Sequence, residues 1–143
     1  MKLARHVGGL SQARKLNYLL ARGWHEEDGG WRCPRRSENA WPLAKAIHHQ
    51  LTEDLCLGLS PSGWTVESYS PRGYARLQDP KDSSLCSLPA ALRRQARREQ
   101  RPVAELTYVL FLAALAGVED GQPQATATTP RRGLARLRFP SST

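Results

Sequence analysis

The sequence LCSLPAALRRQARREQRPVAELTYVLFLAALAG, residues 85–117, carries the strongest structural signal in the chain. A short alternation of apolar and polar residues leads to Pro89, which suits the first turn of a helix because the N–H that proline lacks would be unpaired there. Pro102 opens a second helix for the same reason. From Val103 to Ala116 this helix is apolar nearly all round, so it should be buried on every side. A partner chain or the rest of this protein must cover it.

The helix that follows Pro89 is amphipathic and strongly basic. Leu88, Leu92 and Ala96 recur on one side, and arginines make up the other side. Five arginines occur within nine residues, with Glu99 as the only acid among them, which exceeds what solubility requires. They are candidate contacts to nucleic-acid phosphates: Arg93, Arg94, Arg97, Arg98 and Arg101.

This layout resembles the ribbon-helix-helix DNA-binding family over residues 83–117. The resemblance rests on Leu88-Pro89, on the run Ala96-Arg97-Arg98-Glu99 and on Val103-Ala104-Glu105-Leu106. It implies a homodimer that pairs one strand from each chain into a ribbon, with the helix Val103–Ala116 at the dimer interface. It also implies binding to double-stranded DNA and a role in transcription regulation.

The chain departs from the family pattern at three places. Gln100 stands where family members usually carry glycine, which suits the left-handed conformation at a helix end. Pro102 stands where they usually carry Ser or Thr, capping a helix N-terminus whose amides hold a DNA phosphate. The short ribbon, Ser83 to Ser87, has no long base-reading side chain among its alternate residues. A plain helical hairpin with a basic first helix shares much of this pattern and is the alternative interpretation.

The first 80 residues repeat one order of elements: a helix, a Gly-Trp pair and a β-hairpin. In the first unit, helical spacing runs from Leu10 to Ala21, and Ser11 is a possible cap. The hairpin should turn on Asp28-Gly29, a pair suited to a type I′ turn. The resulting register places Trp24 and Trp31 on the side of the hairpin that should face the core.

The second unit follows the same plan. Its helix repeats an apolar residue every fourth position, at Leu43, Ile47, Leu51 and Leu55. Centring the hairpin turn on Pro71-Arg72 predicts three cross-strand pairs: Val66 with Leu77, Glu67 with Arg76 and Tyr69 with Tyr74. The face with Trp64 and Val66 should then lie toward the core, and the other face should expose the two tyrosines.

We therefore predict an α+β fold. Two helix-plus-hairpin units (residues 1–80) should form a small antiparallel sheet of four strands with both helices on one side. A ribbon-helix-helix-like or plain helical hairpin follows (residues 81–118). From residue 119 the composition changes to Gly, Pro, Gln, Ala and Thr without apolar periodicity, which predicts a disordered basic tail over residues 119–143.

The composition favours a basic protein of a reducing compartment. The 143 residues include 21 Lys or Arg and 13 Asp or Glu, a net charge of +8, which suits nucleic acid or an acidic protein as partner. Three cysteines, an odd number without framework spacing, suit the cytoplasm. No apolar stretch approaches the ~20 residues of a membrane span. We expect a cytoplasmic location.

The sequence predicts no enzyme, cofactor or metal site. No motif surrounds a Ser, Cys or His as nucleophile or base, and no glycine loop continues into the Lys-Ser/Thr pair that cradles phosphate. The spacing of the candidate ligands matches no closed zinc site: His25, Cys33, His48, His49 and Cys56. His49 should point away from the apolar stripe of its helix.

The function predicted is that of a DNA-binding regulator or accessory factor. Further candidate contacts lie on the second hairpin, where arginines beside tyrosines suit phosphate and stacking contacts: Tyr69, Arg72, Tyr74 and Arg76. The alternative is a phage- or plasmid-type adaptor or inhibitor that docks on an acidic protein, since four tryptophans and an arginine surface also suit a protein interface.

Overall fold

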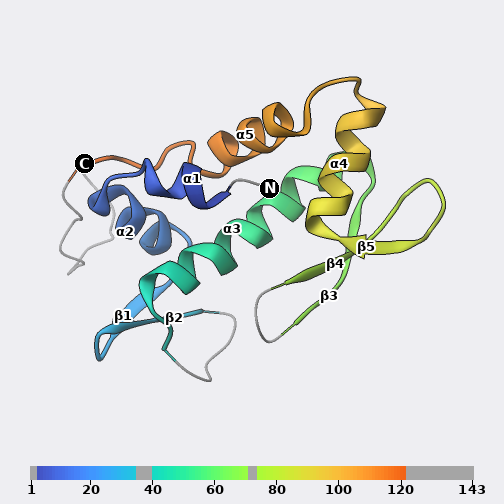
Figure 1. Cartoon of the computed structure of the whole chain (residues 1–143). Coiled ribbons are helices and arrows are strands. Elements are labelled where there is room, and N and C mark those ends of the chain that lie inside the picture. Colours follow the sequence, from blue (N-terminus) through green and yellow to red (C-terminus); the bar gives the residue numbers. More distant parts are fainter. Residues whose placement is uncertain (1–2, 35–39, 71–73, 122–143) are drawn as a thin grey trace, which may run out of the picture.

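The computed structural model describes residues 3–34, 40–70 and 74–121, and it confirms the predicted α+β class. Two helix-plus-hairpin units are followed by a strand and two helices (Figure 1). The helices are α1 (Leu3–Gly8), α2 (Gln12–Ala21), α3 (Leu43–Leu59), α4 (Leu88–Arg98) and α5 (Val103–Ala114), with a 3-10 turn at Ser60–Ser62. The strands are β1 (His25–Glu27), β2 (Gly30–Arg32), β3 (Thr65–Tyr69), β4 (Ala75–Gln78) and β5 (Leu85–Ser87).

The helix α3 is the central element of the fold. Ile47, Leu51 and Leu55 are each at most 1% exposed, as the four-residue repeat predicts. The helix α5 packs against α3 at Gly58, where an added Cβ would lie only 2.8 Å from Leu110 Cδ2. Both expected segments, residues 1–80 and 81–118, contribute to one hydrophobic core.

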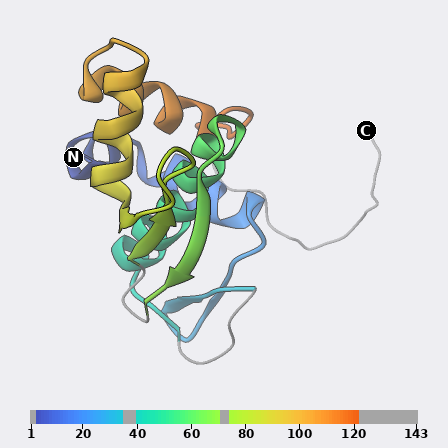
Figure 2. The ribbon, with the colours of Figure 1, turned by 90° about the vertical axis from the view of Figure 1, so that its right-hand side faces the viewer.

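The two hairpins lie toward opposite ends of α3, and they form separate sheets (Figures 1 and 2). One sheet has the order β1-β2, and the other has the order β3-β4-β5. The prediction of a single four-stranded sheet is therefore wrong. At 1.5 Å per residue, the 17 residues of α3 make a helix about 25 Å long, which keeps the hairpins apart.

The first hairpin confirms its predicted turn and register. Its cross-strand pairs are His25–Arg32, Glu26–Trp31 and Glu27–Gly30. Asp28 and Gly29 both have positive φ, 53° and 80°, as a type I′ turn requires. Trp24 and Trp31 are 2% and 4% exposed, so the tryptophan side faces the core.

The helix α1 was absent from the sequence-based expectations, because six residues give periodicity little to act on. Its Leu3 is 6% exposed and belongs to the core. The next helix, α2, confirms its predicted cap, since the Ser11 hydroxyl accepts a hydrogen bond from the Arg14 N–H at 3.1 Å.

The second hairpin departs from the predicted register at one residue. The observed pairs are Thr65–Gln78, Val66–Leu77, Ser68–Arg76 and Tyr69–Ala75. A bulge adds Glu67 to β3, so the predicted pairs of Glu67 with Arg76 and of Tyr69 with Tyr74 are wrong. The extra residue shifts Tyr69 to the inner face, whereas Tyr74 is 61% exposed. Val66 keeps its predicted partner but is 36% exposed, because β3 is an edge strand.

The strand β5 pairs with β4 of the same chain through Arg76–Ser87, Leu77–Cys86 and Gln78–Leu85. Its other edge has no partner strand among the described residues. The strand β5 is followed along the chain by the helices α4 and α5. Pairing of β5 with a second chain stays a prediction.

A left-handed residue ends α4, as expected for the corner between two helices. Gln100 has a φ of 57°. Its N–H donates to the Arg97 carbonyl at 3.1 Å, and the Arg101 N–H donates to the Ala96 carbonyl at 3.0 Å. These two bonds make a Schellman motif, in which glutamine occupies the position that favours glycine.

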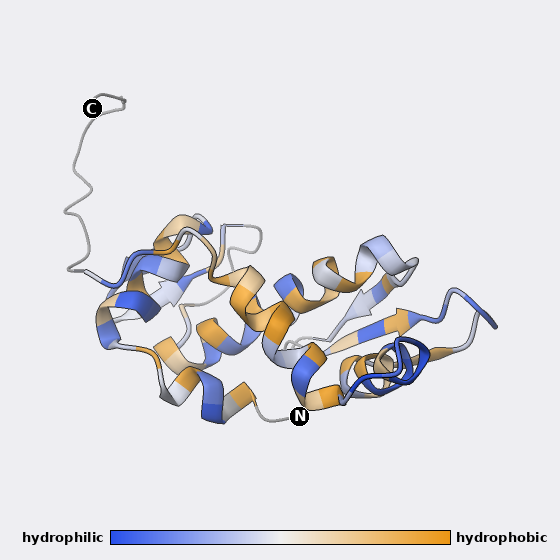
Figure 3. Cartoon of the chain, turned by 90° about the horizontal axis from the view of Figure 1, so that it is seen from above, coloured by the Kyte–Doolittle hydropathy of each residue, from blue (hydrophilic) through white to orange (hydrophobic). Residues whose placement is uncertain are grey.

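Within the described residues, the helix α5 is covered on one side only. Leu106, Phe111 and Ala114 are buried on its inner side. Residues on its outer side are between 38% and 46% exposed: Val103, Tyr108, Val109 and Leu112. Figure 3 shows α5 largely in the hydrophobic colour. The prediction of burial on every side is not met within one chain, because the neighbouring helices reach only the inner side.

No helix in the described ranges is long and apolar enough to cross a membrane. Most of the predicted tail, residues 122–143, lies outside the described residues. Its first residues contact α2, since the Asn17 side-chain amide donates to the backbone carbonyls of Glu119 and Gly121, each at 2.9 Å. The start of the predicted tail is therefore attached to the folded part of the chain.

Candidate nucleic-acid interface

The helix α4 presents an apolar face and a basic face. Its first turn is capped by Ser87, whose hydroxyl accepts a hydrogen bond from the Ala90 N–H at 3.3 Å. Leu88, Leu92 and Ala96 are at most 3% exposed and bury the apolar face. The basic face carries the α4 arginine surface, which consists of Arg93, Arg94, Arg97 and Arg98.

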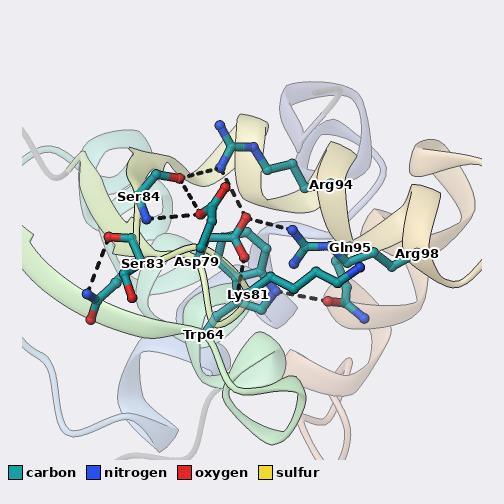
Figure 4. Close-up of polar contacts among 10 residues, drawn as sticks. Trp64, Asp79, Lys81, Ser83, Ser84, Arg94, Gln95 and Arg98 are labelled. Atoms are coloured by element: carbon teal, nitrogen blue, oxygen red, sulfur yellow. Dashed lines mark hydrogen bonds and ion pairs between the residues drawn. The ribbon is translucent and has the colours of Figure 1, made fainter.

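Two arginines of this surface bind one buried carboxylate. Asp79 directly follows β4, and its side chain is 0% exposed. Arg94 Nη1 and Arg98 Nη2 donate to Asp79 Oδ2 at 3.1 and 2.7 Å (Figure 4). The Lys81 N–H donates to the other oxygen, Oδ1, at 2.8 Å. Asp79 thereby fixes the positions of both guanidinium groups.

Electrostatics and geometry agree on the state of this cluster. The hydrogen bond from Arg98, with those from the Lys81 N–H and Arg94, lowers the pKa of Asp79 far below its usual range. The same bond raises the pKa of Arg98. The Ser84 hydroxyl accepts a further hydrogen bond from Arg94 Nη1 at 3.0 Å. Asp79 is therefore ionised at neutral pH, and its bonds to the arginines are charge-assisted.

A second network supports the same helix from the core. The Trp64 indole N–H donates to Gln95 Oε1 at 2.9 Å, and the Gln95 amide donates to Glu99 Oε2 at 2.7 Å. The Arg98 guanidinium lies over the Trp64 ring, 5.4 Å from its centroid, which adds a cation–π contact. Arg98 is thus held by a carboxylate and by an aromatic ring.

The remaining arginines differ in how far their charge is balanced. Arg93 and Arg97 lie one helical turn apart and are exposed, and neither forms an ion pair with a carboxylate of the described residues. Arg101 contacts Glu99 and Glu105, each at 3.2 Å. Of the five predicted phosphate contacts on this segment, two face solvent unpaired, two are anchored by Asp79, and Arg101 is balanced by two glutamates.

The predicted contacts of the second hairpin are only partly available. Tyr69, Tyr74 and Arg76 line one open hollow of about 380 Å³. Tyr69 is partly buried against the core, however, so it cannot serve as the exposed stacking surface that the sequence predicts. Tyr74 packs edge-on against the His48 ring, with 6.2 Å between centroids, and stays exposed. Arg72 lies outside the described residues.

Sequence reasoning missed Asp79, the residue that organises the arginines. The signal is its position, because Ala75 and Leu77 of β4 are buried and Asp79 continues the same alternation one residue beyond the strand. An acid in this core register needs a cation or several donors, since a buried charge without partners is costly. Arg94 and Arg98 supply the cations from α4.

His49 corrects another expectation, because it is 2% exposed although it should point away from the apolar stripe. The ring packs edge-on against Trp41 at 4.9 Å and against Trp24 at 6.0 Å between centroids. Tyr69 lies 6.4 Å away. Aromatic residues from both hairpin units thus cover the side of α3 that the stripe leaves polar.

Within the described residues, no group of three or more His, Cys, Asp and Glu side chains is placed to hold a metal ion. The three cysteines form no disulfide. Burial raises the pKa of the Cys56 thiol to about 12, so this thiol is protonated at neutral pH and is a poor nucleophile.

Comparison with protein-family models, with curated proteins and with solved structures found no match to this chain.

Proposed function

We propose that the protein binds nucleic acid, with double-stranded DNA as its target, by contacting phosphates through the α4 arginine surface. The pairing pattern on α4 carries this proposal. Asp79 holds Arg94 and Arg98 in place, while Arg93 and Arg97 face solvent without a carboxylate partner in the described ranges. One buried negative charge therefore accompanies four positive charges on a single helix face.

This arrangement suits phosphate recognition for two reasons. The planar guanidinium group offers donors in a fixed fork that matches phosphate oxygens. Arg94 and Arg98 are already ordered by Asp79, so they lose little side-chain freedom when they meet a phosphate. Tyr74 and Arg76 are exposed on the neighbouring hairpin and could add contacts. Since phosphate contacts carry no sequence information, we expect modest base preference.

A homodimer through α5 belongs to the same proposal. The exposed apolar side of α5 supports it, because Tyr108, Val109 and Leu112 are 44–46% exposed. A second copy would cover these side chains and would double the arginine surface. In the manner of the ribbon-helix-helix family, the unpaired edge of β5 would then meet β5 of the second copy.

The test is fluorescence anisotropy with a random-sequence duplex over a series of salt concentrations. The double variant Arg93→Gln/Arg97→Gln should bind all duplexes more weakly. It should also lower the slope of log affinity against log salt by about two, one for each lost phosphate contact. Relative preference among duplexes should persist.

The matched control is Lys15→Gln/Lys45→Gln, which removes the same charge from α2 and α3. This variant should leave the salt slope unchanged. If the arginine variant bound the duplex as tightly as the unmodified protein, the proposal would be rejected. The adaptor that docks on an acidic protein would then be the better interpretation of the α4 arginine surface.

A further inference from the structure

A cavity of about 330 Å³ lies between α1, α4 and α5. Pro89 and Leu92 of α4 and Val103 and Ala104 beside them form apolar walls. Small-molecule sites occupy about 300–1,000 Å³ and are mostly apolar with a few placed polar groups. The cavity therefore has the size and the lining of a site for a small ligand.

The polar groups of this cavity are nearly all donors. Arg5 and His6 of α1 and Arg93 of α4 line it, and no carboxylate is among the described residues around it. The His6 ring is positioned by two aromatic rings, with centroid distances of 5.1 Å to Tyr108 and 5.2 Å to Phe111. Two guanidinium groups without a balancing acid favour an anionic ligand group.

Thr107 is the fourth polar residue that lines the cavity, and the residue as a whole is 3% exposed. Its hydroxyl can both donate and accept a hydrogen bond. Thr107 therefore adds a neutral polar group beside the two guanidinium groups.

From these observations we infer that the cavity binds an apolar carboxylic acid of the size of a medium-chain fatty acid. The apolar chain lies against Leu92 and Val103, and the carboxylate meets the guanidinium groups of Arg5 and Arg93. The Thr107 hydroxyl donates to the same carboxylate. The cavity shares Arg93 with the α4 arginine surface, but its size, its apolar walls and Arg5 do not depend on nucleic-acid binding. The inference therefore does not rest on the proposed function.

The test is isothermal titration of the full chain with decanoate, kept below the concentration at which it forms micelles. Decanol and decylamine are the matched probes, because they share the chain and differ in the polar group. Decanoate should saturate with one molecule per chain. Decanol should bind at least about tenfold more weakly, because charge-assisted hydrogen bonds are lost, and decylamine should not bind.

Three variants locate the site. Ala104→Phe should abolish binding by filling the cavity, and it should fold because Ala104 is exposed. Arg5→Gln, at another exposed residue, should weaken decanoate by about tenfold, and Thr107→Val by about threefold to tenfold. Lys45→Gln, remote on α3, should change nothing.

Equal binding of decanoate and decanol would overturn the inference, as would decanoate binding that neither Ala104→Phe nor Arg5→Gln changes. Absence of decanoate binding to the folded protein would overturn it as well. The titrations contain no nucleic acid, so these failures would leave the proposal for the α4 arginine surface untouched.

Discussion

The two Gly-Trp units of this protein share one buried hydrogen-bond pattern. In each unit a glycine with positive φ, Gly23 or Gly63, precedes a buried tryptophan. The indole N–H then donates to a glutamine on the following helix, Trp24 to Gln50 at 2.7 Å and Trp64 to Gln95 at 2.9 Å. Each glutamine amide donates in turn to an acid four residues later, Asp54 or Glu99.

The units differ in which carboxylate is the centre of the network. In the first unit it is Asp54 of α3, whose side chain is 8% exposed and accepts from the Tyr18 hydroxyl, Arg22 and Gln50. In the second unit Glu99 is 32% exposed, and the centre is Asp79 at the end of β4. The central carboxylate thus lies on a helix in one unit and directly after a strand in the other.

This difference separates a structural network from a candidate binding surface. Arg22 is directed inward, since its Nη2 also donates to the Ala114 carbonyl at 2.5 Å, and one arginine meets one carboxylate. In the second unit, Asp79 meets two arginines of a helix face that carries four. The shared hydrogen-bond pattern positions α3 and α4. Of these two helices, α4 alone carries arginines without a carboxylate partner among the described residues.

The variants with the largest expected effect remove the indole N–H that both units use. Trp24→Phe and Trp64→Phe should each lower the free energy of unfolding by about 1–3 kcal/mol, because a buried glutamine oxygen loses its donor. Urea unfolding followed by circular dichroism measures the change. A cost in only one unit would show that the two networks are not equivalent.

Double variants sharpen the same test. Trp64→Phe/Gln95→Leu should recover most of the loss, because Glu99 is partly exposed and water can replace the glutamine. Trp24→Phe/Gln50→Leu should recover less, because it also removes a donor from Asp54, which is nearly buried. Equal recovery in both units would contradict the assigned centres.

The next effect concerns the glycines. Gly23 and Gly63 have φ of 90° and 97°, so alanine should cost about 1–2 kcal/mol at either position from left-handed strain. Gly63→Ala should cost more than Gly23→Ala, because its Cβ would lie 2.9 Å from Pro80 Cβ, against 3.3 Å from Pro34 Cγ at Gly23.

Gly29 is the control for this pair. Its φ is 80°, and nothing lies within 4 Å of an added Cβ. Gly29→Ala should therefore report the conformational strain alone, measured by the same urea unfolding. If Gly63→Ala cost no more than Gly29→Ala, the close approach of Pro80 would not contribute.

Local signals in the sequence predicted the local parts of this fold. The Asp28-Gly29 turn, the stripe of Leu51 and Leu55 and the starts of α4 and α5 depend on neighbouring residues, and the structure confirms them. The bulge at Glu67 was not predictable from alternation, since a regular ladder suits the same residues.

The candidate site depends on contacts between residues far apart in the sequence, which no local sequence pattern predicts. The arginines of α4 stand out in the sequence, but Asp79 lies 15 residues before Arg94 and 19 before Arg98. The strand β5 leads directly into α4, so the pairing of β4 with β5 brings Asp79 close to Arg94 and Arg98. Which arginines are anchored and which face solvent is therefore a consequence of tertiary structure.

The last test uses the pH dependence of stability and concerns Asp79 as the centre of the second unit. Its pKa is lower in the fold than the value of about 3.9 in an unfolded chain. A group of this kind stabilises the fold above its unfolded pKa, and the stabilisation is lost as pH falls through the folded value. Asp79→Asn should therefore show a shallower loss of stability below about pH 4.

Urea unfolding at a series of pH values measures this slope, and Glu26→Gln is the control because Glu26 is exposed on the first hairpin. The control should keep the slope of the unmodified protein, whereas Asp79→Asn should reduce it. An unchanged slope in Asp79→Asn would mean that the ionised carboxylate does not hold Arg94 and Arg98. Their positions would then depend on the Trp64 ring and the Ser84 hydroxyl, and the second unit would lack a charged centre comparable to Asp54 in the first.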